Sequence, residues 1–459
     1  MAVVTSEKRD FTNGKILKKL ILFAIPMAIA TFLQMLFNAA DIAIVGQFGG
    51  SQYQAAVGAT SSTVHLIVNL FIGISVGANV TMANAYGAKD EERQRRVVHT
   101  AMATSITSGI LVLFVGIFLS RPILSAINTP QDIIDYSVSY MQIYFIGAPA
   151  LMVYNFGAAL MRGVGETKKP LYYLLGSGVL NVIINVVTVV CFDMHVVGVA
   201  LGTTLSQYFA AVWIVIDLIK AKTGVQFIPK NLRFHKSELK KMLRIGIPMG
   251  ISSSLFSLSN ISIQSSINDY GKIAIAGNTV ACNVETIGEA FASSVEKSVV
   301  TIVGQNVGAE KPERVPKIIG AGLFACAVCQ VTFGLVLATL GRYVCMLYNR
   351  DAVVIDWAMK RIFTVSALQV LYSLMYSYGA ALRGMGYSIF PMLINLIFTC
   401  FVRIAYVFLI YASFAQKQIE YIYIIYPITW ILSGGMQMLT YYVVASKQGH
   451  FKKRKLQTE

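Results

Sequence analysis

Asp41 is the residue of this sequence best suited to chemistry, because it is a carboxylic acid within a long apolar stretch. A charged group inside a membrane span costs about 2.5 to 3.5 kcal/mol on insertion scales, so such groups usually face a cavity or a partner. About twenty residues at 1.5 Å each place Asp41 in the outer half of a helix. Asn38 and Gln34 lie one and two turns earlier on the same face. We expect this polar stripe to face the interior of a helical lobe; the alternative is a stripe whose hydrogen bonds only hold helices together.

A second polar group lies on two later apolar stretches. Asn181 and Asn185 are four residues apart, so they share one helix face. Counting inward from Pro170 also places Asn185 in the outer half of its span. Thr203 lies about two turns from the start of the following span. These side chains can therefore meet Asp41 at one level of the membrane.

The elements that carry these residues are apolar helices. The 459-residue chain is 56% hydrophobic and 13% charged, whereas an ordinary soluble domain is about 25% charged. Twelve apolar stretches, from residues 19–45 to residues 419–445, are long enough to cross a bilayer, which takes about 20 residues each. We therefore predict an all-α membrane protein of twelve transmembrane helices, without a sizeable soluble domain.

The net charge of +16 is explained by topology. The basic residues gather in the N-terminal segment, in alternate loops, in the connector 220–244 and in the C-terminal tail. This asymmetry is the positive-inside signature, which places both termini in the cytoplasm. A bacterial inner membrane is the expected location, and no nucleic-acid partner is needed to explain the charge.

The chain pairs with itself at an offset of about 221 residues. Residues 24–27 meet 246–249, residues 86–90 meet 307–311, and residues 160–165 meet 381–386, with Pro170 opposite Pro391. We predict two six-helix lobes (1–219 and 243–446), a basic linker (220–242) and a basic tail (447–459). Six spans per repeat give both lobes the same orientation, and transporters built this way bind substrate near the repeat interface.

Several motifs together resemble the multidrug and toxic compound extrusion (MATE) family of transporters, in its bacterial multidrug-exporter branch. They are Pro26 with residues 38–41 and Gly46, and the segments 160–167, 180–185 and 303–309. The resemblance runs along essentially the full length and implies a V-shaped bundle of two lobes. It implies that Asp41, Asn38, Asn181, Asn185 and Thr203 form a cation site, and Asn155 matches a further family position. Pro26 permits a kink in the first helix; bending there is a mechanism suggested for family members, and a static kink is the alternative.

The sequence departs from one family pattern at Asn185, where some members carry a second carboxylate. Two possibilities remain for the coupling ion. Asp41 alone exchanges H+, or Asp41 binds Na+ together with the neutral oxygens of Asn181, Asn185 and Thr203, since Na+ is a hard cation suited to oxygen ligands. We expect no cofactor other than this ion.

The second half has Ile263 opposite Asp41, and its acids lie on the eighth span instead. Glu285 matches a glutamate of the multidrug-exporting relatives, so we expect it to attract a cationic substrate, with Gln34 as a second substrate contact. The alternative for Glu285 is a structural ion pair with Lys297 or Arg403. For Glu289 and Glu296 we favour a structural role.

The predicted function is secondary antiport, in which organic, lipophilic and cationic compounds leave in exchange for H+ or Na+. The protein is not expected to be an enzyme. Its predicted partners are small organic solutes and membrane lipids, and it is expected to be a monomer. One alternative is a lipid-linked oligosaccharide flippase of the same superfamily, which needs a strongly cationic cavity; the intramembrane basic residues counted here reduce to little beyond Lys297 and Arg403. Another is a membrane-embedded transferase, but the five histidines are dispersed.

Overall fold

A computed structural model describes residues 10–127, 129–222, 224–414 and 418–447, and within these ranges the chain is helical and has no strand. Only Lys447 of the predicted basic tail falls inside them. The elements in chain order are α2 (Ile16–Ile44), η1 (Val45–Gly49), α3 (Ser51–Gly87), α4 (Glu91–Ala126), α5 (Ile134–Ile146), α6 (Ala148–Gly163), α7 (Lys168–Val186), η2 (Val187–Cys191), α8 (His195–Lys220), η3 (Pro229–Asn231), α9 (Lys236–Asn268), α10 (Lys272–Gly308), η4 (Pro312–Arg314), α11 (Val315–Met346), α12 (Ala352–Thr364), η5 (Ser366–Leu371), α13 (Tyr372–Gly384), α14 (Ile389–Ile394), η6 (Asn395–Phe401), α15 (Val402–Ala405), η7 (Tyr406–Ile410), η8 (Tyr411–Ser413), α16 (Ile419–Tyr423) and α17 (Ile425–Lys447).

The all-α membrane architecture is confirmed. Eight helices of the described chain are long and apolar enough to span a bilayer, or nine if α5 and α6, bent by 47° at their junction, form one span. The remaining predicted spans correspond to α9, α10 and the pair α12 with α13. These helices carry the serines at 252–254, three glutamates of α10 and the basic residues of α12. These segments do not meet the criterion of length and apolar composition for a membrane span. They also contribute most of the side chains that line the polar cavity of unit 2 described below.

The contacts divide the chain into two compact units. Unit 1 comprises residues 1–10 and Ile29–Gly250, and unit 2 comprises Phe11–Ala28 and Ile251–Glu459. The division runs through α2 and through α9, each of which is one continuous helix. The units therefore differ from the predicted lobes in two segments. Residues 11–28 belong to unit 2, and the connector with the beginning of α9 belongs to unit 1.

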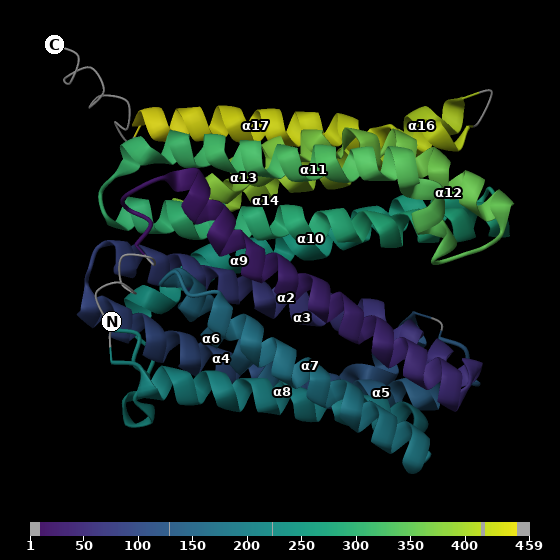
Figure 1. Cartoon of the computed structure of the whole chain (residues 1–459), viewed down its shortest axis with the longest axis horizontal. Helices are drawn as coiled ribbons and strands as arrows, with labels where there is room; N and C mark the ends of the chain where they lie inside the picture. Colours follow the sequence, from purple (N-terminus) through teal and green to yellow (C-terminus); the bar gives the residue numbers. More distant parts are fainter. Residues whose placement is uncertain (1–9, 128, 223, 415–417, 448–459) are drawn as a thin grey trace. The chain divides into compact units, whose positions relative to one another are not determined.

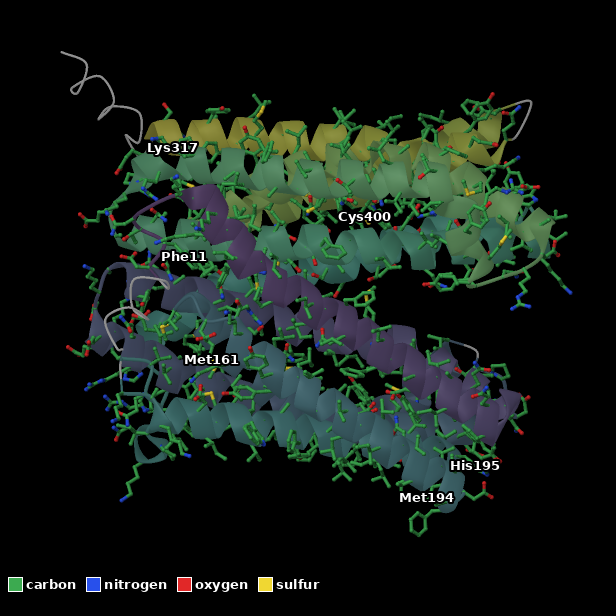
Figure 2. The ribbon with its side chains drawn as sticks, in the orientation of Figure 1. Phe11, Met161, Met194, His195, Lys317 and Cys400 are labelled. Atoms are coloured by element: carbon green, nitrogen blue, oxygen red, sulfur yellow. The ribbon has the colours of Figure 1, made fainter. Side chains whose placement is uncertain are left out.

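Within each unit the helices pack in a repeated pattern. In unit 1, α3 and α4 pack on α6, and α7 packs on α8. In unit 2, α10 and α11 pack on α13, and α14 packs on α17, as can be followed in Figure 1. Figure 2 shows the side chains that project from these helices. Many exposed ones are large and apolar, among them Phe114 and Phe118 of α4 and Leu335 and Leu340 of α11, as a lipid-facing surface requires.

The backbone confirms the internal repeat of 221 residues. Lys89 and Glu310, which the offset pairs, both have a φ of 56°. Gly165 and Gly386, also paired, have φ values of 83° and 89°. Non-glycine residues rarely adopt positive φ, so its recurrence at matched positions shows that the two halves end these helices in the same way.

Side-chain packing repeats at the same offset. A Cβ added to Gly163 would lie 2.8 Å from Met82 Cβ, and one added to Gly384 would lie 2.8 Å from Val303 Cβ. Met82 and Val303 are themselves 221 residues apart. The Arg-Gly segment that suggested the repeat is therefore a close helix contact, in which only glycine fits.

In unit 1, α3 and the first part of α9 cross at backbone distance. A Cβ on Gly73 would lie 2.3 Å from the nitrogen of Gly250, and a Cβ on Gly77 would lie 2.1 Å from the carbonyl oxygen of Met242. A Cβ on Gly246 would likewise lie 2.4 Å from the Cα of Ile74. Small residues allow membrane helices to approach this closely.

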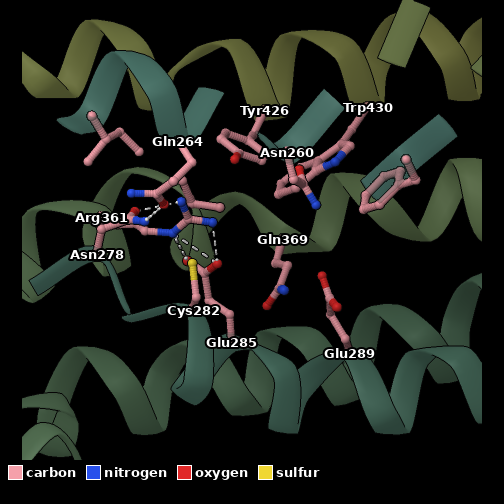
Figure 3. A pocket seen from close by; sticks show the side chains of 13 residues that line it. Asn260, Gln264, Asn278, Cys282, Glu285, Glu289, Arg361, Gln369, Tyr426 and Trp430 are labelled. Carbon is pink, nitrogen blue, oxygen red and sulfur yellow. Dashed lines mark hydrogen bonds and ion pairs between the residues drawn. The ribbon is translucent and has the colours of Figure 1, made fainter. Parts of the chain in front are cut away.

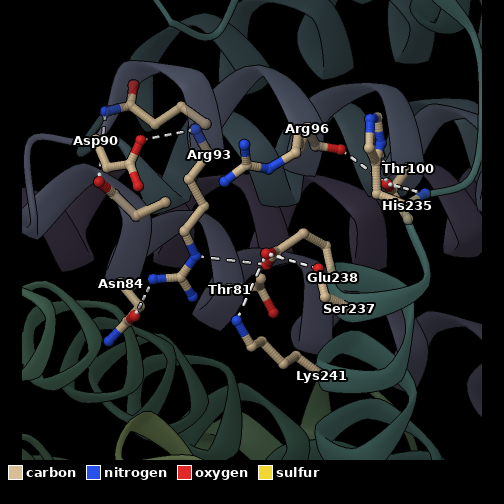
Figure 4. A network of polar contacts seen from close by, with 12 residues as sticks. Thr81, Asn84, Asp90, Arg93, Arg96, Thr100, His235, Ser237, Glu238 and Lys241 are labelled. Carbon is tan, nitrogen blue, oxygen red and sulfur yellow. Dashed lines mark hydrogen bonds and ion pairs between the residues drawn. The ribbon is translucent and has the colours of Figure 1, made fainter.

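Polar contacts fix the connector and the start of α9 on α4 (Figure 4). Glu238 is buried and lies 3.5 Å from both Arg93 Nε and Lys241 Nζ. Arg93 also donates to the side chain of Asn84 at 2.8 Å, and His235 donates its backbone N–H to Thr100 at 3.1 Å. This segment is therefore part of the folded body of unit 1.

Candidate functional site

Asp41 lies buried in unit 1, where three helices meet. Its side chain is 6% exposed and lies near the end of α2. Asn185 Nδ2, from α7, donates to Asp41 Oδ1 at 2.6 Å, and Thr203 Oγ1, from α8, lies 3.3 Å from Asp41 Oδ2. No basic side chain of the described chain forms an ion pair with Asp41. The carboxylate is thus held by neutral donors alone.

The neighbouring amides and hydroxyl have hydrogen-bonding capacity to spare. Asn181 Nδ2 donates to Thr203 Oγ1 at 3.4 Å. The Thr203 hydroxyl is also 3.0 Å from the carbonyl oxygen of Val199, and it can donate to only one of its two acceptors. The Oδ1 atoms of Asn181 and Asn185 are buried and have no partner within the described residues. The structure therefore brings together Asp41, Asn181, Asn185 and Thr203 with two free oxygens; their role as a cation site stays a prediction.

Gly202 is a member of this site that the sequence interpretation missed. A Cβ at this position would lie 1.9 Å from Asn185 Oδ1, so α8 reaches the amide only because residue 202 has no side chain. Its place directly before Thr203 is the signal that could have identified it. In addition, π-helical turns follow Asp41 at Val45–Gly49 and Asn185 at Val187–Cys191. Such turns are frequent at functional sites.

The predicted polar stripe faces the interior only at its last residue. Gln34 and Asn38 are exposed, whereas Asp41 is buried. The prediction that the whole stripe faces the lobe interior was therefore wrong. The reason is the helix period: Asp41 is rotated by about 60° from Asn38 around the axis, enough to separate a buried position from an exposed one.

Two other predicted residues lie apart from the carboxylate. Asn155 is half-buried on α6 and donates to the carbonyl oxygen of Leu151 one turn earlier, at 2.8 Å. Pro26 is buried in the middle of α2, in the part that belongs to unit 2. Their predicted roles in cation binding and bending stay predictions.

Glu285 in unit 2 is fully engaged by a partner that was not predicted. Arg361 donates Nε to both of its carboxylate oxygens, at 3.2 and 3.1 Å, and a terminal nitrogen to Oε2 at 2.8 Å. Ser366 Oγ lies 3.2 Å from Oε1, and another terminal nitrogen of Arg361 donates to Asn278 at 2.9 Å. Glu285 is 6% exposed and Arg361 is 5% exposed. This geometry favours the structural ion pair over attraction of a cationic substrate.

The predicted partners of Glu285, Lys297 and Arg403, were wrong. So was the expectation that intramembrane basic residues reduce to these two, because Lys297 is exposed while Arg361 and Arg383 are buried. Arg383 forms an ion pair with Glu296. The error arose from the predicted span 353–382. It is two helices, α12 and α13, joined by the 3-10 turn η5, and Arg361 lies in the last turn of α12.

A cavity of about 110 Å³ lies beside this ion pair (Figure 3). Its polar wall includes Glu289, Asn260 and Gln369, and its aromatic wall includes Tyr426 and Trp430. Figure 3 shows the carboxylate of Glu289 on the side of the cavity away from the joined Arg361 and Glu285.

Arg403 is the second basic residue near this cavity. It is 0% exposed, and its Nε donates to Thr429 at 3.0 Å. Its guanidinium carbon lies 4.5 Å from the ring centroid of Tyr426 and 5.5 Å from that of Phe256. Its two terminal nitrogens have no hydrogen-bond partner within the described residues, so two aromatic rings are its main compensation.

Comparison with known proteins identifies a matching family model and relatives of this chain. The MatE family model matches residues 26–187 and 248–409, one match in each repeat. The chain is 24% identical over 438 residues, 94% of each protein, to the probable multidrug resistance protein YoeA of Bacillus subtilis strain 168. It is also 24% identical over 348 residues to the multidrug export protein MepA of Staphylococcus aureus N315, covering 76% of this chain and 77% of that protein.

Solved structures share the fold. The structure described as "Crystal structure of MATE in the bent conformation" superposes with a TM-score of 0.89 at 19% identity. The superposition covers 96% of this chain and 98% of the other. At this identity the likeness establishes the fold.

Proposed function

The chain belongs to the MatE family of multi-pass membrane transporters, and from that premise we propose that it is an antiporter which exports organic solutes in exchange for H+ or Na+. Relatives named as multidrug resistance and multidrug export proteins support solute efflux across the plasma membrane. The observation that carries the coupling proposal is the site around Asp41. It is a buried carboxylate without a basic partner in the described chain, next to two amide oxygens that accept nothing.

The side-chain amide of Asn185 can supply the two states that coupling requires. In the present geometry the Asn185 amide nitrogen donates to Asp41, which suits an ionised carboxylate. A flip of the amide presents Oδ1 instead, and two facing oxygens repel each other unless a proton or Na+ lies between them. Cation binding therefore reverses the preferred amide orientation, and the site has one hydrogen-bond pattern when empty and another when occupied.

Antiport follows when the cation and the solute favour different conformations of the transporter, since a ligand shifts an equilibrium only through differential affinity. One monovalent cation that moves inward through about 150 mV releases about 3.5 kcal/mol. That free energy sustains roughly a several-hundred-fold gradient of a neutral solute. The basic segments favour a cytoplasmic location for both termini, and in that orientation we expect the coupling cation to reach Asp41 from outside.

Lipophilic cations are the proposed substrate class, but Glu285 no longer supports it, because Arg361 neutralises that carboxylate. Glu289, which lines the cavity of unit 2 and forms no ion pair within the described chain, is the acid that we propose in its place. Arg361 and Arg383 give no support to the flippase alternative, since each is paired with a glutamate; of the three buried arginines described above, Arg403 alone lacks a carboxylate partner.

Transport by purified protein in proteoliposomes tests the proposal. A H+ gradient and a Na+ gradient are imposed separately, and accumulation of a fluorescent organic cation is followed. We expect one gradient to drive accumulation and Asp41→Asn to abolish it. Accumulation of the organic cation in the absence of both gradients would contradict the proposal.

A further inference from the structure

The connector between α8 and α9 carries two sets of large apolar side chains, one buried and one exposed. Val225 and Phe227 are buried in the core of unit 1. Ile228, Leu232 and Phe234, which we call the apolar triplet, are 37%, 40% and 48% exposed. Single exposed apolar residues are common on protein surfaces, but these three form a cluster within one short segment. Packing inside unit 1 accounts for the first set and leaves the apolar triplet to another environment.

Hydrogen bonds of the connector fix its depth relative to the membrane spans. Phe227 donates its backbone N–H to the carbonyl oxygen of Leu218, in the last turn of α8, at 3.0 Å. Ile228 donates its backbone N–H to His99 Nε2 of α4 at 3.2 Å. His99 follows the polar start of α4, residues 91–96, where the sequence turns apolar, and a spanning helix makes this change at the membrane surface. The connector therefore lies at the level of the membrane surface.

The exposed charge of the connector has one sign. Residues 220–244 contain eight lysines and arginines and a single acid, Glu238. Glu238 is buried and is held by Arg93 and Lys241, as Figure 4 shows. Exposed basic residues are interleaved with the apolar triplet, and we call them the basic triplet: Lys230, Arg233 and Lys236. The outer side of the connector is thus apolar and cationic, with no exposed acid among its described residues.

We propose that residues 228–236 form an interfacial anchor for anionic phospholipids of the adjoining leaflet. The apolar triplet enters the boundary between headgroups and acyl chains, and the basic triplet binds the lipid phosphates. Segments that combine large apolar and basic side chains lie in this boundary, and an anionic membrane surface attracts each basic residue. The distribution of basic residues along the chain favours the cytoplasmic leaflet.

A lipid is the occupant that matches both triplets. A soluble phosphate would satisfy the charges alone and leave the apolar triplet in water, whereas a phospholipid offers an anionic headgroup and an apolar boundary side by side. The inference concerns lipid binding, so it stands or fails separately from antiport and from the identity of the coupling ion.

A tryptophan placed in the anchor reports its contact with lipid. The full chain carries Phe234→Trp, and phenylalanine replaces its three native tryptophans, Trp213, Trp357 and Trp430. The protein is reconstituted in nanodiscs of phosphatidylcholine and phosphatidylglycerol, in which one lipid at a time carries bromine on its acyl chains as a quencher. The matched control is Glu91→Trp in the same background, because Glu91 is exposed in the charged first turn of α4. We expect brominated lipid to quench the Phe234→Trp reporter at least about twofold more than the control.

The basic triplet should enrich the anionic lipid around the reporter. At equal mole fraction, brominated phosphatidylglycerol should quench at least about twofold more than brominated phosphatidylcholine. This preference should disappear, while quenching by phosphatidylcholine persists, in the triple variant Lys230→Gln, Arg233→Gln and Lys236→Gln. The control removes three exposed basic residues of unit 2 and should keep the preference; its substitutions are Lys272→Gln, Lys317→Gln and Arg350→Gln.

A second measurement keeps the native tryptophans and therefore stays valid if their replacement unfolds the chain. Lipids retained by the detergent-purified protein are counted by native mass spectrometry, and the parent should retain more phosphatidylglycerol than the basic-triplet variant does. The proposal is overturned if the Phe234→Trp reporter is quenched no more than the Glu91→Trp reporter. It is overturned equally if the parent shows no preference for phosphatidylglycerol, or if the two triple variants show the same preference.

Discussion

Asp41 and Glu285 are both buried acids on membrane helices, yet their surroundings are opposite. Asp41 accepts hydrogen bonds from an amide and a hydroxyl and has no basic partner in the described chain. Glu285 is bound by the guanidinium of Arg361 through both oxygens. An acid left without a counter-charge can take up a cation, whereas an acid bound by arginine is committed to structure. The depth of an acid in the membrane does not decide between these roles; the reach of an opposite charge on another helix does.

Replacement of Asp41 tests the uncommitted side of this comparison and has the largest expected effect. We expect Asp41→Asn to lower concentrative export at least about 100-fold, because the amide cannot exchange a cation. Its thermal stability should stay within about 1 kcal/mol of wild type, since the change leaves no buried charge unpaired. Export in proteoliposomes and unfolding in detergent measure the two effects, and export at the wild-type level would contradict the assignment.

Replacement of Glu285 tests the committed side. Glu285→Gln leaves the buried guanidinium of Arg361 without its counter-charge, so we expect a loss of about 3 to 5 kcal/mol of stability. Export of cationic and neutral substrates should fall in parallel. The double variant Glu285→Gln with Arg361→Met should recover stability, because replacement of a whole buried pair by apolar groups is often neutral. A selective loss for cationic substrates, in a stable single variant, would return Glu285 to substrate binding.

Gly202 sharpens the comparison within unit 1. We expect Gly202→Ala to push the Asn185 amide away from Asp41, because the new Cβ would lie 1.9 Å from Asn185 Oδ1. A hydrogen bond to a charged group contributes roughly 1.5 to 3 kcal/mol, so export should fall by about tenfold or more. Gly58→Ala in α3 is the control, since no atom lies within 4 Å of its added Cβ. Equal export by the two variants would show that this amide is dispensable.

Asn185→Asp has the smallest expected effect and addresses the coupling ion. With H+ as the coupling ion, a second carboxyl beside Asp41 should turn one protonation step into two coupled steps. With Na+, the added charge should strengthen Na+ binding instead. Substrate uptake into inverted vesicles, measured against pH with and without Na+, separates these outcomes. An unchanged profile in both series would place Asn185 outside the cation site.

The sequence predicted the parts of this structure that depend on local pattern. Apolar length indicated the helical fold, and the 221-residue offset reappears in the backbone of Lys89 and Glu310. The sequence also placed Asp41, Asn185 and Thr203 at one depth in the membrane, because depth follows from counting residues along a helix.

Contacts between helices could not be predicted in this way. Asn38 is exposed because its side chain points about 60° away from that of Asp41 around the helix axis. Counting residues gives the depth of a side chain in the membrane but not which neighbouring helix it faces. Arg361 could not be identified as the partner of Glu285, because the break between α12 and α13 changes where the chain turns. Gly202 matters only through its distance from a side chain of another helix.

The division of α2 between the two units has a consequence for how the protein is made. Residues 11–28 are made long before the rest of unit 2, to which they belong and whose other residues begin at Ile251. At about 5 to 20 residues per second, this segment waits on the order of tens of seconds for its packing partners. Unit 1 in turn is complete only after residue 250. Unit 1 can therefore mature before unit 2, but only after the start of α9 has been made, and a chain interrupted at the predicted linker would leave unit 1 unfinished as well as unit 2.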